Sequence, residues 1–258
     1  MIHSSEGSAP LVISFPHVGT GLPADLAVGM TERGRAVPDT DWHVEKLYAF
    51  AKEQGVSWVE PTLSRYVVDL NRPPDDAALY PGQVSTGLCP SATFGGESLY
   101  LGQPPDALEI ARRCDLYWRP YHRRLRELLD RTVAQHGYAV LLDAHSIASH
   151  VPRLFEGRLP DLNVGTHDGG SCGPGLGQAV LVAASTGQFT AVLNGRFKGG
   201  YITRHYGRVA GPVHTVQLEI GQLAYLHAES VDWAPARAAA LVAVLERVVS
   251  VLLAWRPT

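Results

Sequence analysis

Cysteine is scarce in this 258-residue chain, and the sequence has neither a basic stripe nor a long hydrophobic run. The three cysteines, Cys89, Cys114 and Cys172, are odd in number and widely separated, and none belongs to a Cys-x-x-Cys pair of the kind that binds zinc. A disulfide framework is therefore not expected. A reducing compartment fits this cysteine usage best.

The charge and the hydropathy of the chain exclude further classes of protein. The formal net charge is −3, and because binding to nucleic acid needs clustered basic side chains, no nucleic-acid partner is expected. The first residues lack the basic start and the apolar stretch of a signal peptide. The most apolar segment, Ala238 to Trp255, is interrupted by Glu246 and Arg247 and falls short of the roughly 20 apolar residues of a membrane span. We expect a soluble, cytoplasmic protein that does not associate with membranes.

Short apolar runs alternate with helical patterns along the chain. The apolar runs predict strands at Leu11–Phe15, Ser57–Val59, Tyr66–Leu70, Tyr138–Leu142, Val180–Ala183 and Thr215–Ile220. Helical spacing predicts helices over residues 44–51, from Pro105 to about Gln135 with a kink or break at Pro120, and from Pro235 onward. This alternation predicts an α/β fold, and the absence of an internal repeat or a clear boundary indicates a single domain over residues 1–258.

Two long segments do not fit the alternation of strands and helices. Asn71–Gln103 is rich in Pro, Gly, Ser and Thr, and Pro160–Gly177 is rich in Gly. Loops of this length in a compact domain are usually functional or disordered. Tyr80, Phe94 and Tyr100 lie in the first segment, and their aromatic rings favour an ordered loop that forms part of a site.

Polar residues stand where several apolar runs end. His17 follows the first run, Asn71 and Arg72 follow the third, His145 follows the fourth, and Glu219 interrupts the last. In open α/β sheets the ligand sites lie at the carboxyl ends of the strands. We therefore expect these side chains to meet at one edge of the sheet.

Two histidines and a carboxylate in such a position match a catalytic zinc site, which uses three protein ligands and keeps a position open for water. Imidazole nitrogen and carboxylate oxygen also suit other first-row metals, and a histidine at a strand end is often only structural. We take His17, His145 and Asp41 as the candidate ligands, although Asp41 would also serve as a helix N-cap. Asp39 and Asp143 remain alternatives, the latter also as a group that orients His145.

Alternation along the last predicted strand places Glu219 on the same face as Gln217. Val216, Leu218 and Ile220 lie on the opposite face. The functional interpretation is a general base beside the metal site. The alternative is a solvent-facing strand residue, which periodicity alone does not exclude.

Two arginines are candidates for binding a carboxylate, because a guanidinium pairs with it through two parallel hydrogen bonds. Arg72 lies beside Asn71, and Arg204 follows a pair of glycines, although an arginine in a loop is usually a surface residue. No glycine motif for nucleotides follows a predicted strand. Ser146 next to His145 has no Gly-x-Ser-x-Gly elbow, which argues against a serine hydrolase.

Segments spread from about Pro16 to Leu223 resemble the N-formylglutamate amidohydrolase (deformylase) family. They are PHVGTGLP, DTDWHVEKLY, RYVVDLNRPP, LYPGQ, YWRPYH, LLDAHSI, LFEGRLPDLNVGT, NGRFKGGYITRHYG and VQLEI. Together these motifs are highly specific, whereas any one alone would not be. The family is related to zinc carboxypeptidases, so the resemblance implies a zinc-carboxypeptidase-like (phosphorylase/hydrolase-like) fold, with a mixed, largely parallel sheet flanked by helices.

The resemblance also implies a reaction, the zinc-dependent hydrolysis of N-formyl-L-glutamate to formate and L-glutamate, which is the last step of a histidine degradation route. The candidate residues follow one another along the chain in the same order as the site residues of carboxypeptidases. By this resemblance His17, Asp41 and His145 would hold zinc, and Glu219 would act as the base. The usual His-x-x-Glu of carboxypeptidases is absent, because Thr20 stands three residues after His17. The acidic ligand must therefore come from elsewhere in the chain.

The partner implied is a small dicarboxylate, bound by Asn71 with Arg72 and by Arg204, with Arg65 as a substitute for either arginine. We also consider His167 as a residue near the site. The chain is expected to be a monomer or a small homo-oligomer. Two alternatives stay open, namely a related zinc amidohydrolase or carboxypeptidase-like enzyme for another N-acyl amino acid, and an inert binding protein on the same fold.

Overall fold

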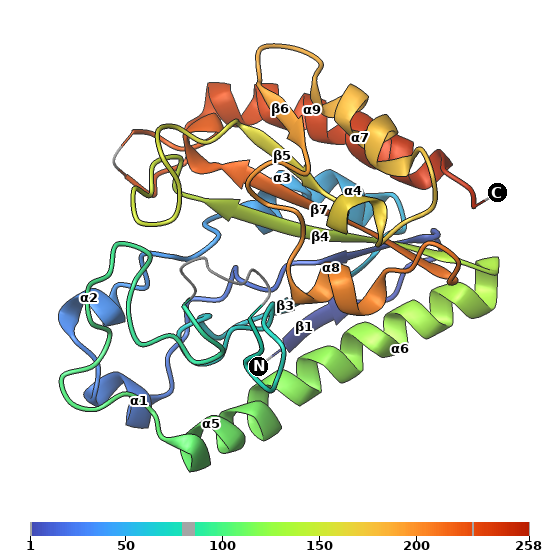
Figure 1. Cartoon of the computed structure of the whole chain (residues 1–258). Helices are drawn as coiled ribbons and strands as arrows, with labels where there is room; N and C mark the ends of the chain where they lie inside the picture. Colours follow the sequence, from blue (N-terminus) through green and yellow to red (C-terminus); the bar gives the residue numbers. More distant parts are fainter. Residues whose placement is uncertain (1, 79–85, 229, 258) are drawn as a thin grey trace.

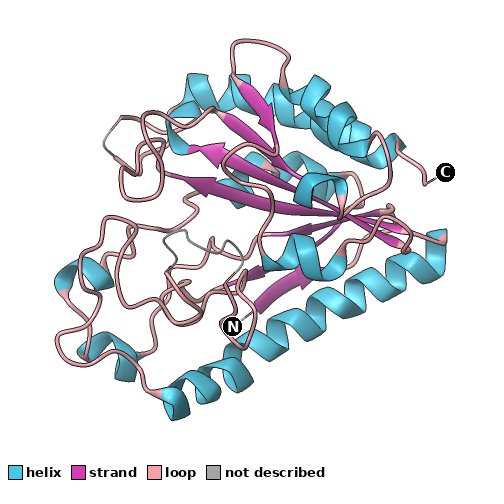
Figure 2. Ribbon diagram, viewed as in Figure 1, coloured by secondary structure: helices cyan, strands magenta, loops and turns pink. Residues whose placement is uncertain are grey.

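A seven-stranded sheet forms the centre of the computed structural model, which describes residues 2–78, 86–228 and 230–257 (Figures 1 and 2). Its strands are β1 (Ile2–Ser5), β2 (Leu11–Ser14), β3 (Ser57–Pro61), β4 (Ala139–Ile147), β5 (Leu162–Gly165), β6 (Ala191–Leu193) and β7 (Val213–Gly221). They lie in the order β1-β3-β2-β4-β7-β5-β6. β1 is antiparallel to β3, and β5 is antiparallel to β7, whereas the other neighbouring pairs are parallel. The prediction of a mixed, largely parallel sheet in an α/β fold is confirmed.

Helices cover both faces of this sheet. Figure 1 shows α7 and α9 on one side and α6 on the other. The helices are α1 (Ala24–Val28), α2 (Glu32–Arg35), α3 (Val44–Leu47), α4 (Ala49–Glu53), α5 (Ala107–Arg113), α6 (Arg119–His136), α7 (Leu176–Ala184), α8 (Tyr201–Tyr206) and α9 (Pro235–Ala254). Short helical turns add Cys114–Trp118, His167–Gly169 and Gln222–Ala224. Among the described residues, no helix combines the length and the hydrophobicity that crossing a membrane requires.

The central strand β4 divides the hydrophobic core into two layers. Val140 and Leu142 pack in the cluster that includes the buried face of α9, and Ala139 and Leu141 pack in the cluster that includes α6. Successive side chains of a strand point to opposite faces, so a strand that is covered on both faces must be apolar throughout. All of β4 is buried, and its first part, up to Leu142, is the continuous apolar run that predicts a strand covered on both faces.

The helical stretch after Pro105 contains one irregular turn. A π-helical turn over Cys114–Trp118 joins α5 to α6, and Pro120 lies in the first turn of α6. The ring of a proline clashes with the carbonyl group four residues earlier in a regular helix, here that of Leu116. The wider π turn accommodates this clash, so the expected kink or break at Pro120 takes the form of a local widening.

Two predicted strands are wrong. Val180–Ala183 lies inside α7, because a four-residue apolar run satisfies the helix pattern as well as the strand pattern. Tyr66–Leu70 is buried but turns instead of pairing, and the Asp69 N–H donates to the carbonyl oxygen of Leu88 in the following loop. Conversely, the segment Pro160–Gly177, predicted as a loop, contains strand β5.

The substitution Leu141→Ala tests whether the side chains of β4 stabilise the hydrophobic core. Leu141 is fully buried, and removing a buried leucine side chain should lower the free energy of unfolding by about 2–5 kcal/mol, measured by urea denaturation. Leu108 on α5 is 82% exposed, so the matched substitution Leu108→Ala should change it by less than about 0.5 kcal/mol. Equal losses in the two variants would contradict the assignment of β4 to the core.

Candidate functional site

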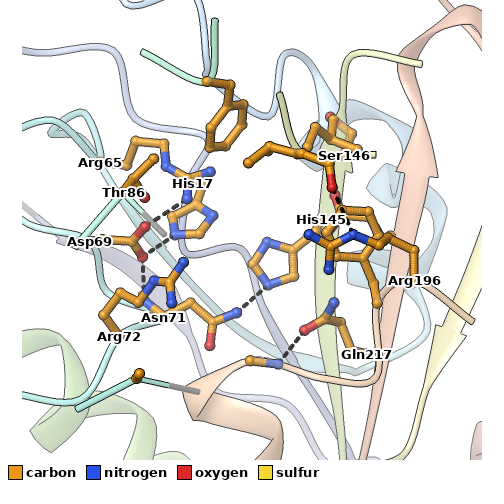
Figure 3. A pocket seen from close by; sticks show the side chains of 17 residues that line it. His17, Arg65, Asp69, Asn71, Arg72, Thr86, His145, Ser146, Arg196 and Gln217 are labelled. Atoms are coloured by element: carbon orange, nitrogen blue, oxygen red, sulfur yellow. Dashed lines mark hydrogen bonds and ion pairs between the residues drawn. The ribbon is translucent and has the colours of Figure 1, made fainter. Parts of the chain in front are cut away.

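The parallel pairing of β2, β4 and β7 brings their carboxyl ends to one edge of the sheet. In the register of β4 and β7, His145 lies beside Glu219, and Asp143 lies beside Gln217. His17 follows the end of β2, which pairs with β4 on its other side. The predicted side chains at three strand ends therefore meet in one place (Figure 3).

His17, Asp41 and His145 form a buried group that could hold a metal ion. One candidate ligand atom from each lies within 4.8 Å of the other two, and none of the three residues is more than 3% exposed. Asp41 Oδ2 lies 3.0 Å from His145 Nδ1 and 3.7 Å from His17 Nδ1. The Asp41 N–H donates to the carbonyl oxygen of His17, which ties the two segments together.

A buried carboxylate faces the second nitrogen of each imidazole. Asp69 Oδ1 lies 2.7 Å from His17 Nε2, and Asp143 Oδ1 lies 3.1 Å from His145 Nε2. Since an ionised carboxylate can only accept a hydrogen bond, the contact with Asp69 favours a proton on His17 Nε2 and leaves His17 Nδ1 facing Asp41. Both nitrogens of His145 face carboxylates, Asp143 at Nε2 and Asp41 at Nδ1. The same arrangement of carboxylate and histidine commonly surrounds protein metal ions.

Two buried polar atoms that lack a hydrogen-bond partner show whether this group suits a cation. His17 Nδ1 and Asp41 Oδ1 are buried without a hydrogen-bond partner in the described structure. A buried polar atom left in this way costs about 1–3 kcal/mol, because its contact with water is lost without replacement. A divalent cation held by the three residues would satisfy His17 Nδ1 and compensate the charge of the Asp41 carboxylate, so the residues present fit a metal ion.

The charges around the two imidazoles also favour a cation. Burial lowers the pKa of His145, but the carboxylates of Asp143 and Asp41 raise it more, and the net pKa lies well above its usual value. A metal ion competes with such a proton for the imidazole lone pair and benefits from the same negative charges. The pKa of His17 is lowered by burial and by the Arg65 guanidinium, which favours the neutral imidazole that ligation needs.

Asp39, an alternative ligand, has other partners. Its Oδ2 accepts hydrogen bonds from the Tyr66 hydroxyl at 2.6 Å and from the Phe94 N–H at 2.7 Å. It is not part of the buried metal-binding group, and neither is Asp143, whose carboxylate faces the outer nitrogen of His145. Asp41 is therefore the acid that the geometry favours.

Asn71 connects the metal-binding group to the loop before α8. Its Nδ2 donates to Asp143 Oδ2 at 3.2 Å and lies 2.9 Å from His145 Nε2, while its Oδ1 accepts from the Ile202 N–H at 2.7 Å. A Cβ on Gly200 would approach the Asn71 amide to 2.5 Å, so this contact requires glycine. The Asn71 side chain thus organises the site, and its role as a substrate ligand stays a prediction.

The YWRPYH motif holds the backbone on both sides of Asn71. His122 Nε2 donates to the carbonyl oxygen of Leu70 at 2.9 Å, and Trp118 Nε1 donates to that of Arg72 at 3.0 Å. Burial lowers the pKa of His122 to about 3, so its imidazole stays neutral near pH 7. These two residues of the motif therefore position the backbone of Arg72. The sequence of the motif alone did not indicate this role.

A cavity opens over the metal-binding group, and both Glu219 and Gln217 line it, as the alternation along β7 predicts. Burial raises the pKa of the Glu219 carboxyl to about 8, and the charge of Asp41 adds to this shift, whereas His145 and Arg65 oppose it. A cation bound nearby would lower this pKa, because an opposite charge favours the ionised form. Glu219 is thus a titratable group in the lining of the cavity next to the metal-binding group.

Three arginines line this cavity, and only two of them were predicted. Arg65 and Arg72 belong to the predicted set, and Arg196 was overlooked. Arg65 is bound to Asp69, with Nη2 at 2.6 Å from Oδ2. Arg204 lies outside the lining and donates from Nε to the Gly199 carbonyl oxygen, so its proposed contact with substrate stays a prediction.

The remaining candidates are distributed as follows. Phe94 lines the cavity, which supports a site-forming role for the loop after Asn71, whereas Tyr80 lies outside the described residues. The Ser146 hydroxyl lies 2.8 Å from that of Tyr225, so it is held in a structural hydrogen bond. His167 is exposed and does not line the cavity.

Asp69 is the residue that the sequence reasoning most clearly missed. It accepts a hydrogen bond from Arg65, faces His17 and caps the backbone N–H of Asn71 at 2.8 Å. Its charge inside the apolar run Tyr66–Leu70 was the available signal, since an acid inside a buried segment needs a partner. The assignment of that run to a strand concealed it.

Known proteins share both the sequence and the fold. The sequence profile of a family described as N-formylglutamate amidohydrolase matches residues 9–226. A relative from Pseudomonas putida named N-formylglutamate deformylase is 48% identical over 254 residues, which cover 97% of this chain and 94% of the relative. One of the same name from Pseudomonas aeruginosa strain PAO1 is 49% identical over 253 residues, covering 97% and 95%.

Two solved structures share the fold. The crystal structure of N-formylglutamate amidohydrolase from Ralstonia eutropha JMP134 matches with a TM-score of 0.83 and 23% identity, over 97% of this chain and 96% of the other. A gene product of Agrobacterium tumefaciens matches with a TM-score of 0.74 and 17% identity, over 97% and 94%. At these identities the likeness concerns the fold alone.

The substitution Asp41→Asn tests the metal-binding group. It removes the one acid whose oxygen faces both Nδ1 atoms, so the purified variant should hold less than about a tenth of the divalent metal of the wild type, since even groups that only support ligands typically cost 10–100-fold in affinity. Asp39→Asn is the matched control, two residues away, and should keep the full metal content by elemental analysis. Loss of metal from Asp39→Asn alone would reverse the assignment.

Proposed function

We infer that this chain, which belongs to the N-formylglutamate amidohydrolase family, is an N-formylglutamate deformylase that hydrolyses N-formyl-L-glutamate to formate and L-glutamate. The observation that carries this inference is the 48% identity with the Pseudomonas putida deformylase over 97% of the chain. The buried His17, Asp41 and His145 beside Glu219 provide the chemistry that an amidohydrolase needs.

The proposed metal is zinc. Two imidazoles and one carboxylate are a common ligand set of catalytic zinc, and they leave a coordination position for reactants. Such an ion supplies Lewis acidity, which polarises a carbonyl oxygen and lowers the pKa of water. His17, Asp41 and His145 would hold this ion, with the Nδ1 atoms of the two histidines facing Asp41 and with Asp69 and Asp143 contacting the Nε2 atoms of the two rings.

Glu219 is the proposed general base. It lies beside His145 in the register of β4 and β7, and it lines the cavity. Its carboxylate takes a proton from the water that attacks the formyl carbon, and it then delivers that proton to the amide nitrogen as the C–N bond breaks. A carboxyl whose pKa is raised toward neutrality by burial performs both steps well.

Arg72 is the proposed ligand of one substrate carboxylate. Its guanidinium lines the cavity and makes no hydrogen bond or ion pair within residues 2–78, 86–228 and 230–257. Its backbone is fixed by Trp118, which limits the conformational freedom that binding must remove. Arg65, in contrast, is already paired with Asp69, so the structure favours Arg72 over Arg65 for this contact.

A cytoplasmic location is proposed as well. All three cysteines, Cys89, Cys114 and Cys172, are free thiols, which suits a reducing compartment.

A formate-release assay tests the function and the need for metal together. The wild type should release formate from N-formyl-L-glutamate and should act at least about tenfold more slowly on N-formyl-L-aspartate and N-acetyl-L-glutamate, since one methylene or methyl group is worth 10–200-fold in a fitted pocket. Removal of metal by a chelator should abolish the reaction, and stoichiometric zinc should restore it. Preference for another N-acyl amino acid would instead support a related amidohydrolase, and no turnover of any of them would support a binding protein.

The substitution Glu219→Gln isolates the proton transfer. The amide keeps the shape of the carboxylate but accepts no proton, so kcat should fall by about 10²–10⁴-fold while the metal content stays that of the wild type. Glu246→Gln, an exposed change on α9, is the matched control and should leave kcat within about twofold of the wild type. An unchanged kcat in Glu219→Gln would remove this residue from the mechanism.

A further inference from the structure

The substrate of the proposed function carries two carboxylates, and each requires a cation or several strong donors inside the cavity. Arg65, Arg72 and Arg196 are the arginines that line it within the described part of the chain. Arg65 is bound to Asp69 at 2.6 Å and lies 3.8 Å from Asp41 Oδ1, so its charge is balanced by protein carboxylates. Arg65 therefore belongs beside the metal-binding group, and Arg72 and Arg196 are the other two arginines of this lining.

Arg196 is held in place by its surroundings. Its Nε donates to the carbonyl oxygen of Leu154 at 2.9 Å, and its guanidinium lies 5.4 Å from the centre of the Phe197 ring. Leu154, Phe197 and Ile147 line the cavity beside it. A guanidinium fixed in this way next to apolar side chains suits a carboxylate at the end of a short methylene chain, because the rigid planar fork loses little freedom on binding.

The topology separates the two arginines. Arg72 belongs to the turn that begins at Asp69, the carboxylate behind His17. Arg196 follows β6, the edge strand, and β5 and β7 lie between β6 and the strand β4 that carries His145. Figure 3 shows Arg72 on the side of Asp69 and Arg196 on the side of Gln217, with His145 between them in this view.

We propose that Arg196 binds the side-chain carboxylate of the substrate and thereby selects an acidic side chain, while Arg72 binds the α-carboxylate next to the scissile amide. This assignment rests on the proposed function. It follows from position, because the side-chain carboxylate is the end of N-formylglutamate farthest from the formyl group, and Arg196 comes from the edge of the sheet. It differs from the prediction of Arg204, which does not line the cavity.

A pair of substrates with a pair of variants tests the assignment. N-formyl-L-glutamine replaces only the side-chain carboxylate by an amide of the same shape. The wild type should prefer N-formyl-L-glutamate over it by roughly 10²-fold in kcat/KM, as expected for the loss of a bidentate charged contact. In Arg196→Gln the kcat/KM for N-formyl-L-glutamate should fall by about 10²-fold, whereas that for N-formyl-L-glutamine should change by less than about threefold, so the preference disappears. The loss should appear mainly in KM.

Four further variants complete the experiment, and one of them, Arg204→Gln, should keep the preference of the wild type. Arg72→Gln should slow both substrates by similar factors, because both carry the α-carboxylate. Arg196→Lys keeps the charge without the fork and should retain an intermediate preference. Arg247→Gln, an exposed change on α9, should match the wild type.

Each contrary result has a distinct meaning. A preference that survives in Arg196→Gln, or one that disappears in Arg204→Gln or Arg72→Gln instead, would overturn the assignment. An Arg196→Gln variant that slows both substrates equally would also overturn it, because a folding defect or a merely structural role has no reason to depend on the side chain of the substrate. A wild type that releases formate from neither substrate would refute the function itself, and the assignment with it.

Discussion

An excess of buried negative charge around two imidazoles is the constraint on which this site depends. Asp41, Asp69 and Asp143 are all at most 1% exposed, and Glu219 is 8% exposed. Burying an ionised carboxylate costs several kcal/mol unless an opposite charge compensates it. Arg65 compensates Asp69 by direct contact, and it reaches Asp41 only at 3.8 Å. The remaining charge favours a cation beside these carboxylates, which a protonated His145 or a metal ion held by His17, Asp41 and His145 would supply.

The turn from Asp69 to Arg72 joins this charge balance to substrate binding. Asp69 faces His17, Asn71 reaches Asp143 and His145, and Arg72 lines the cavity. A strand could not direct these side chains to their targets, because it would send alternate residues to opposite faces of the sheet. The turn directs each of them to its target. The hydrogen bonds from the YWRPYH motif to the carbonyl groups on either side of Asn71 take the place of the backbone pairing of a strand.

This difference explains how much of the site could be predicted from the sequence. The apolar runs of β4 and β7 and the polar residues within them are local signals, so His145 and Glu219 followed from periodicity and from the rule that sites lie at strand ends. Asp41 came from residue chemistry and order along the chain, without a local signal that separated it from Asp39. Asp69 faces His17 and Arg196 donates to Leu154, and each of these contacts joins segments that are distant in the sequence, so no single window of sequence contains it. The strand assigned to Tyr66–Leu70 failed for the same reason, since its burial is visible in the sequence and its turn is not.

The chain also separates chemistry from selectivity in space. Two of the candidate metal ligands and the proposed base stand in or shortly after central strands that are buried throughout, which is where a protein holds atoms most rigidly. The two arginines assigned to the substrate carboxylates stand in connecting segments. The Trp118 indole donates to the carbonyl oxygen of Arg72, and Arg196 Nε donates to the carbonyl oxygen of Leu154. Arg196 belongs neither to the metal-binding group nor to the hydrophobic core clusters, so a change there is expected to alter which acid is bound without disturbing the candidate ligands. An amidohydrolase built in this way can change its substrate at the edge of the sheet while its centre keeps the same reaction.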